Sequence, residues 1–417
     1  MDSVTSVTSV TSVTSPSRSP PSPVWVIAAA TVLTFWCVGT SYSWGVIQAA
    51  LVTDGVGDPT LLSFVGGCWV VCIAVFAIPN ARVVHALGAQ RAALLGVSLL
   101  VVGELLASAA VRSISGLFIT IGLITGYGSS LCFMVIATVP AAFFPPERRG
   151  LANGIIFSGS GLGGAFTSFT AEKIIARSGP AWTFRILGLS TLATALPAAW
   201  IVRDAGAVPR RALIDWTLFR DPRFALLFAA GAIGTFPLFV PPFFLPLYCE
   251  SIGLSAATGA ALVAGFNIAS AGGRVGFGVV CDVLGPLHAL LIGLVFGAVS
   301  MLTLWPLTHT LGPLVVFVVV NGAANGAFFA TMPTVVGSVF GSARVAVAMG
   351  MVVTGWAGGY LMGAPIAGYL LDTFGGPEKG FVSYRPAMFY AGGMAMAAAL
   401  LIMGLRLKME RKLRTRV

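Results

Sequence analysis

Charged side chains are scarce in this sequence of 417 residues, because only 9% are Asp, Glu, Lys or Arg. Soluble domains carry about 25% of such residues, whereas 57% of this chain is hydrophobic. The composition therefore excludes an ordinary soluble enzyme or binding domain, and it predicts an integral membrane protein that has the lipid bilayer as its surroundings.

Residues that bind metals or act as nucleophiles are also few, with three histidines and six cysteines. No CxxC pair occurs, and nearly all cysteines lie inside apolar runs, where we interpret them as small core residues. The histidines (His85, His288 and His309) fall at the ends of apolar segments, without carboxylate partners at helical spacing. The sequence therefore favours neither a membrane enzyme nor a metal site nor a cofactor.

The net charge of +10 is not arranged as in nucleic-acid-binding proteins. Its basic residues flank apolar segments and form no patch with interleaved aromatic residues, so we expect no nucleic-acid partner. Loops on the side of the two termini carry seventeen Lys and Arg residues, against five on the opposite side. Because positive charge favours cytoplasmic loops, both termini are predicted to be cytoplasmic, most simply at the plasma membrane.

Long apolar runs dominate what is present, and a membrane-spanning helix needs ~20 apolar residues. A low-complexity stretch at 1–23 has the composition of a disordered cytoplasmic tail, a polar linker occupies 203–223, and a basic tail occupies 406–417. The parts between them, 24–202 and 224–405, each contain six apolar segments. The segments lie at about 24–52, 60–79, 91–111, 113–144, 151–176, 180–202, 224–249, 256–283, 287–308, 311–337, 345–371 and 386–405.

Two halves of six segments predict an all-α integral membrane fold with twelve transmembrane helices, built as a two-repeat transporter. Weak internal repetition supports this prediction. The turn ARVVHALGAQR after segment 2 and the turn GVVCDVLGP after segment 8 occupy matching places in their halves. In segment 7, Pro237, Pro241, Pro242 and Pro246 predict a kink or interruption, since each proline removes a backbone donor.

Arg274 is the most informative single residue, because it lies within the body of segment 8. An arginine at the centre of a membrane helix is ~2.5–3.5 kcal/mol unfavourable on insertion scales, so such residues face a polar cavity or a partner. Asn267, seven residues earlier, shares its helix face. Arg274 is therefore a candidate for binding an anionic substrate, and the alternative is a simple anchor that extends to the cytoplasmic interface.

Other polar and aromatic residues within the spans are further candidates for substrate binding. For the asparagines of segment 10, lining of a cavity and hydrogen bonding between helices are equally compatible with the sequence. Aromatic residues such as the candidates Tyr42, Tyr127 and Trp356 are more often packing residues than ligands. Glu104 is a candidate proton carrier, with a structural role as its alternative. The substrate candidates besides Arg274 are Asn267, Ser270, Asn321, Asn325, Tyr42, Gln48, Tyr127 and Trp356.

Several motifs together resemble the major facilitator superfamily, and within it the fungal branch of the monocarboxylate transporter family. They are FFPPERRGLANGIIFSGSGLGG at 143–164, GRVGFGVVCDVLGP at 273–286, Trp305 with Pro306, and GAPIAGYLLD at 363–372. The resemblance implies the major facilitator fold and assigns structural roles to motif residues at the cytoplasmic helix ends. These residues are Glu147, Arg148, Arg149, Gly150, Asn153, Gly278, Asp282 and Gly285.

The resemblance also implies alternating-access transport of a small organic anion, with Arg274 at the place of the family's arginine. Val46 and Ser270 occupy places where proton-coupled relatives carry ionisable groups, so a weaker dependence on protons is expected. Export of an acidic secondary metabolite is the alternative function. A sensor that binds without transporting is the alternative of another class. The sequence gives no indication for or against an accessory subunit.

Overall fold

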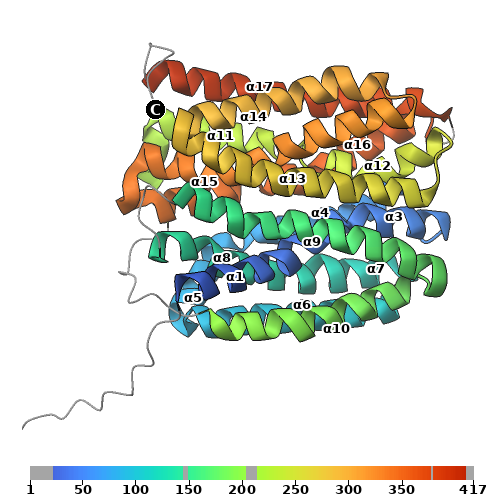
Figure 1. Ribbon diagram of the computed structural model, residues 1–417, viewed down its shortest axis with the longest axis horizontal. Coiled ribbons are helices and arrows are strands. Elements are labelled where there is room, and N and C mark those ends of the chain that lie inside the picture. Colours follow the sequence, from blue (N-terminus) through green and yellow to red (C-terminus); the bar gives the residue numbers. More distant parts are fainter. Residues whose placement is uncertain (1–21, 144–148, 203–213, 377–378, 410–417) are drawn as a thin grey trace, which may run out of the picture.

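The protein is a bundle of helices whose axes are roughly aligned (Figure 1). The computed structural model describes residues 22–143, 149–202, 214–376 and 379–409. Every regular element within these ranges is a helix, which confirms the predicted all-α class.

The first half of the chain forms the part of the bundle that is coloured blue to green in Figure 1. The helices α1, α2 and α3 make one interrupted span, and α4 and α5 make another that is bent by 55°. In chain order the elements are α1 (Pro23–Thr34), the π-helical η1 (Phe35–Gly39), α2 (Thr40–Tyr42), α3 (Trp44–Thr53), α4 (Pro59–Val75), α5 (Ala77–Leu87), α6 (Ala89–Ala110), α7 (Ile114–Leu117), the π-helical η2 (Phe118–Thr125), α8 (Gly126–Phe143), α9 (Arg149–Ser178) and α10 (Pro180–Ile201).

The second half repeats this plan in the yellow-to-red part of Figure 1. A break at Gly341, where φ is 71°, divides α15 into two spans. The elements are η4 (Trp216–Arg220), α11 (Pro222–Gly234), α12 (Val240–Ser251), α13 (Ala256–Leu284), α14 (Pro286–Val299), the π-helical η5 (Ser300–Leu304), η6 (Trp305–Leu307), α15 (Leu311–Gly355), α16 (Ala357–Thr373), η8 (Phe381–Tyr384) and α17 (Arg385–Met409).

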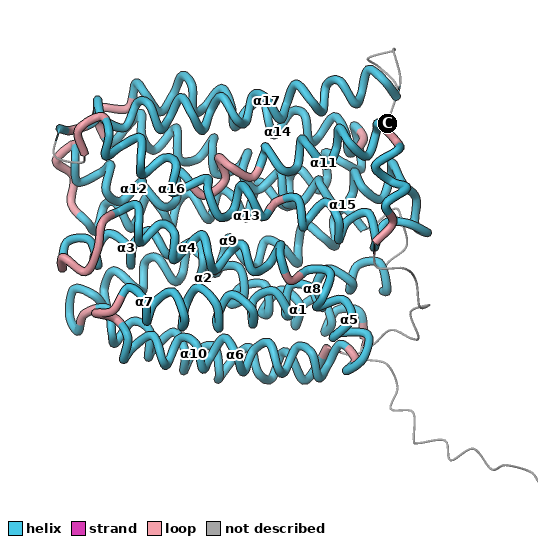
Figure 2. Tube along the Cα trace, turned by 180° about the vertical axis from the view of Figure 1, so that it is seen from behind, coloured by secondary structure: helices cyan, strands magenta, loops and turns pink. Residues whose placement is uncertain are grey.

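Two prolines show how the segments bend. Pro237 lies in the non-helical stretch between α11 and α12, which confirms the predicted interruption of segment 7. Figure 2 shows loop segments among the helices as well as at the ends of the bundle. The expected end of segment 2 at Pro79 is wrong, because α5 continues to Leu87. Pro79 lies in the first turn of α5, where a helix does not need its missing N–H.

The described residues contain twelve segments that agree with the twelve predicted membrane crossings. Eight helical spans in the described residues are each long and apolar enough to cross a membrane, and the bent pair of α4 and α5 makes a ninth. Helices α9 and α13, with 30 and 29 residues, are long enough but rich in glycine and polar residues. This composition fits their position, because they pack along each other between the two halves. The interrupted pair of α11 and α12 is the twelfth segment.

Small residues bring α9 and α13 into contact across the halves. A Cβ placed on Gly161 would lie 2.6 Å from the carbonyl oxygen of Asn267, and one on Gly154 would lie 2.8 Å from that of Arg274. Helix α3 packs on α12, and α4 packs on α16. We call the end with Pro23 and Met409 the tail end and the opposite one the far end. At the far end the Thr60 hydroxyl donates to the Asp372 carboxylate at 2.7 Å.

Candidate functional site

Arg274 lies at the boundary between the halves and is only 1% exposed. Its helix, α13, places the guanidinium against α9 and α2 of the first half. One terminal nitrogen donates to the Phe157 carbonyl at 2.7 Å and also to the Ser160 hydroxyl. The other donates to the Tyr42 hydroxyl at 3.0 Å. The guanidinium is therefore inside the protein and does not extend to the interface.

All hydrogen-bond acceptors of Arg274 are neutral. Among the described residues, the one ion pair joins Arg223 and Asp221 at the start of α11. There the hydrogen bond from Arg223 holds the pKa of Asp221 below its usual range. Arg274 has no such carboxylate, and its Nε has no hydrogen-bond partner in the described part of the chain. A buried, uncompensated positive charge is costly, and an anion that reaches it would be strongly stabilised.

Two aromatic rings lie close to the guanidinium. The Cζ of Arg274 lies 4.9 Å from the ring centroid of Phe329 on α15 and 5.6 Å from that of Tyr42. Cation–π attraction stabilises a guanidinium in this position without neutralising its charge. Tyr42 in turn stacks on Phe239 of the second half, with ring centroids 5.1 Å apart and planes at 23°. The site is therefore a cation with an aromatic wall.

Asn267 adds a neutral polar group beside Tyr42. Its side chain is fully buried, and neither amide atom has a hydrogen-bond partner among the described residues. A Cβ on Gly164 of α9 would lie 2.8 Å from the amide carbon of Asn267 and 2.9 Å from the Cβ of Tyr42. The missing side chain at Gly164 thus lets Asn267 and Tyr42 approach α9 closely. Buried amides without partners are rare, so this one is available to a ligand.

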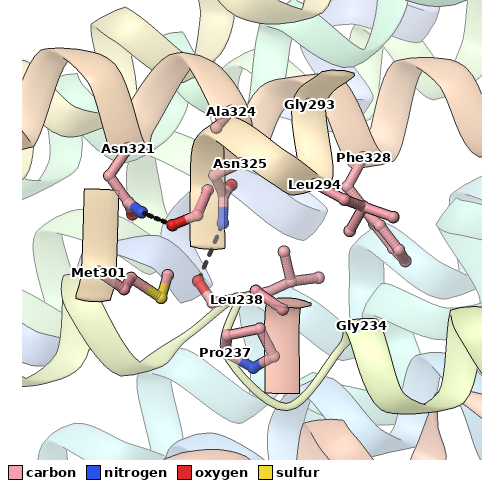
Figure 3. A pocket seen from close by; sticks show the side chains of 12 residues that line it. Gly234, Pro237, Leu238, Gly293, Leu294, Met301, Asn321, Ala324, Asn325 and Phe328 are labelled. Carbon is pink, nitrogen blue, oxygen red and sulfur yellow. Dashed lines mark hydrogen bonds between the residues drawn. The ribbon is translucent and has the colours of Figure 1, made fainter. Parts of the chain in front are cut away.

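Ser270, Asn321 and Asn325 belong to a neighbouring hydrogen-bond network inside the second half. Ser270 donates to the Asn325 side chain at 3.4 Å, and Asn325 donates to the Leu238 carbonyl at 2.9 Å. Asn321 donates to Ser300 at 2.7 Å. Both asparagines line a cavity of about 30 Å³ between α11, α14, α15 and α17 (Figure 3). Asn321 and Asn325 therefore line a cavity and also form hydrogen bonds between helices. Neither asparagine forms a hydrogen bond with Arg274 among the described residues.

Three further substrate candidates contact other partners. Gln48 donates to the Ser63 hydroxyl at 3.1 Å, and Tyr127 packs edge-on against Phe76 with centroids 5.0 Å apart. Trp356 is 1% exposed and packs against Phe328. None of these three has a contact with Arg274 among those of the described residues. They remain candidates for other stages of transport.

Glu104 also lies away from the arginine. It is 2% exposed on α6, where the Thr191 hydroxyl of α10 donates to its carboxyl at 3.1 Å. The Cβ of Glu104 is near Gly188 of the same partner helix. In this position Glu104 connects α6 to α10 through a hydrogen bond, which agrees with a structural role. Its role as a proton carrier remains a proposal.

The motif residues lie at the tail end or outside the described ranges. Glu147 and Arg148 are outside the described residues, and Arg149 and Gly150 are described only as the start of α9. Asn153 is buried on α9, Gly278 is buried on α13, and Asp282 is exposed near the end of α13. Gly285, with φ of 94°, joins α13 to α14, as Gly88, with φ of 82°, joins α5 to α6. These turns repeat each other.

Sequence reasoning missed Ser160, Phe239 and Phe329. Ser160 belongs to the glycine-serine run of 157–164, whose polar character was a signal that could have been followed. The two phenylalanines resemble every other apolar residue of the spans. Only the arrangement of the halves shows that their rings reach the Arg274 region.

The family model of the Major Facilitator Superfamily matches residues 24–310 and 250–416. The chain belongs to the Major Facilitator Superfamily. Among solved structures, this superfamily member resembles the nucleoside transporter NupG, with a TM-score of 0.71 and 14% identity over 91% of this chain and 99% of that chain. The likeness shows the shared fold, and the protein is a membrane transporter of this superfamily.

Fungal transporters are among its relatives in sequence. The MFS-type transporter pynF of Aspergillus niger is 24% identical over 91% of this chain and 88% of its own. The agnestins efflux protein AgnL12 of Paecilomyces divaricatus is 25% identical over 94% and 88%. The fujikurins efflux protein of Gibberella fujikuroi is 30% identical over 63% and 56%. The monocarboxylate branch is not singled out by these matches.

Proposed function

We propose that this transporter exports an acidic secondary metabolite by alternating access, with Arg274 as the anion-binding residue. Three relatives are named as efflux proteins, for aspyridones, agnestins and fujikurins. Uptake of a small monocarboxylate, which the sequence motifs imply, would use the same arginine. The names of these relatives favour export of a secondary metabolite over uptake. In this proposal both termini are cytoplasmic and the protein lies in the plasma membrane.

The observation that carries the anion site is the burial of Arg274 without a carboxylate. Neutral oxygens satisfy both of its terminal nitrogens but leave the charge uncompensated. A guanidinium offers two parallel N–H groups to the two oxygens of a carboxylate, so an acid can replace the neutral acceptors with a stronger bond. The substrate would thereby be held between the halves.

Alternating access fits the contacts around this residue. Arg274 on α13 bonds to α9 and α2, so opening of the halves changes the acceptors that it reaches. Rocking of two repeats about a midplane site is the usual scheme for such transporters. An anion that binds Arg274 while the halves separate would replace the contacts that the arginine loses. This explains why neutral partners are suitable while the halves are in contact at Arg274.

The test is counterflow of labelled carboxylates in reconstituted vesicles with Arg274→Lys and Arg274→Ala. Lysine keeps the charge and loses the planar fork, so we expect carboxylate transport to fall about tenfold or more. Alanine should lose more, because truncation of one member of a buried charged pair costs ~2–5 kcal/mol.

The matched control is Arg185→Lys. Arg185 is also within a span, but it bonds to Ser108 and lies over Trp182 in the first half. Transport by this variant should be unchanged at equal membrane abundance. Normal carboxylate counterflow by Arg274→Lys would refute the anion site. Substrate binding without any counterflow in the wild type would support the non-transporting sensor instead.

A further inference from the structure

The stacked pair of Tyr42 and Phe239 joins the two halves of the molecule. Tyr42 ends α2 in the first half, and Phe239 precedes α12 in the second. Both rings are buried, at 0% and 4% exposure, and their centroids are 5.1 Å apart. A contact of this kind must open whenever the halves move apart on this side.

Both rings lie at breaks in their helices. Ser43, next to Tyr42, separates α2 from α3, and Phe239 ends the non-helical stretch between α11 and α12. Backbone at such breaks is held by fewer helical hydrogen bonds, and it can absorb a small change in ring position. A flat ring has a thickness of ~3.5 Å. A flat ring would therefore fit between Tyr42 and Phe239 when the distance between their ring centroids rises to about 7 Å.

Polar groups for the rest of a ligand surround this pair. The Tyr42 hydroxyl accepts a hydrogen bond from Arg274, so the cation is at the edge of the stack. Asn267, whose amide has no partner among the described residues, packs near the Cβ of Tyr42. The Arg274 side chain can bind an acidic oxygen, and the Asn267 side chain can bind a carbonyl or hydroxyl oxygen.

We propose that the transported acid has a flat, conjugated ring that inserts between Tyr42 and Phe239, with its acidic oxygen on Arg274 and a second oxygen on Asn267. This inference rests on the proposed function and adds the class of substrate. Stacking on both faces would replace the Tyr42–Phe239 contact that opening breaks. A saturated acid of the same size cannot stack and would leave both faces uncovered.

The experiment compares naphthalene-2-carboxylate with decahydronaphthalene-2-carboxylate in counterflow by the reconstituted full-length protein. The two acids share a carboxylate and a carbon skeleton, and only the first is flat. Stacked aromatic rings attract each other beyond the effect of buried area alone. We therefore expect the wild type to prefer the flat acid about fivefold to tenfold. Phe239→Leu should reduce this preference to about twofold or less.

Phe317→Leu is the matched control. Phe317 is also fully buried and stacked, on Trp305 at 4.8 Å and 22°, but within the second half alone. The Phe317→Leu variant should keep the wild-type preference for the flat acid. This control distinguishes loss of the ring slot, the space between Tyr42 and Phe239, from a general loss of packing. Tyr42→Phe keeps the ring and should keep the preference, while total carboxylate transport decreases.

The outcomes distinguish this inference from the function on which it rests. Equal transport of both acids that still requires Arg274 would overturn the ring slot and leave the anion site standing. An unchanged preference in Phe239→Leu would overturn it too. Transport of 2-acetylnaphthalene but of neither acid would refute the anion site while supporting the slot. Binding of none of the three probes would overturn both.

Discussion

Arg274 and Asn267 share a helix face but have different surroundings. The arginine has neutral oxygens on both terminal nitrogens, whereas the asparagine amide has no partner in the described residues. An unpaired buried amide costs about 1–3 kcal/mol. Such a cost persists in a stable protein when the group is needed in another state. The two residues together therefore mark the central site more clearly than either alone.

Glu104 allows a test of proton coupling at a single residue. Its carboxyl meets the Thr191 hydroxyl and lies between α6 and α10, so we expect it to be structural. Glu104→Gln should leave counterflow within about twofold of the wild type, because glutamine keeps the shape and the acceptor oxygen. The measurement is transport with and without an imposed pH gradient, and neither protein should respond strongly. Gradient-driven accumulation in the wild type that disappears in Glu104→Gln would instead identify Glu104 as the proton carrier.

Prediction from sequence was most successful where one helix holds all the information. The cost of an arginine within a span and the seven-residue spacing to Asn267 placed both residues on one buried face. The contact of Arg274 with Tyr42 joins residues 232 positions apart, and no local pattern encodes it. Phe239 and Phe329 could not be separated from other apolar residues, because hydrophobicity does not reveal which half a ring contacts.

At the scale of elements, the close packing of α9 and α13 controls the position of the site. Glycines of α9 leave out the side chains that would hold the two backbones apart. Gly161 contacts the Asn267 backbone, and Gly154 contacts that of Arg274. The sequence alone does not show that α13 is the helix on which α9 packs.

Gly161→Ala should weaken this contact between the halves. The new Cβ would lie 2.6 Å from the Asn267 carbonyl oxygen and 2.8 Å from the Cβ of Ala271, so backbone must move. Overpacking of this kind costs typically ~1–3 kcal/mol. We expect a lower thermal-unfolding midpoint in detergent and at least a fivefold loss of transport.

Gly272→Ala on α13 is the control for this substitution, because no atom lies within 4 Å of its added Cβ. It should leave both the unfolding midpoint and transport near their wild-type values. Equal behaviour of the two variants would show that the packing of α9 on α13 does not depend on Gly161.

At the scale of the whole molecule, the two halves repeat a plan that the sequence showed only weakly. The positive-φ turns at Gly88 and Gly285 join the second helix to the third in each half. A side chain is rarely tolerated at such a backbone angle, which explains why glycine stands at both turns. The twelve segments and their division were predictable from hydropathy, and the prolines predicted the break in segment 7. The break in segment 1 and the stacking of Tyr42 on Phe239 needed the structure.

The orientation of the whole molecule decides which side the Thr60–Asp372 contact closes. The excess of Lys and Arg in tail-end loops predicts that this end is cytoplasmic and that the far end is outside. Arg220, at the end of η4, and Lys379, between α16 and α17, are both exposed and lie at opposite ends of the bundle. All six native cysteines are buried or partly buried, so background labelling should be low. In sealed cells a membrane-impermeant maleimide should label Lys379→Cys and spare Arg220→Cys until the membrane is opened. The reverse pattern would place the far end in the cytoplasm and refute the predicted orientation, and the Thr60–Asp372 bond would then join the two halves on the inner side.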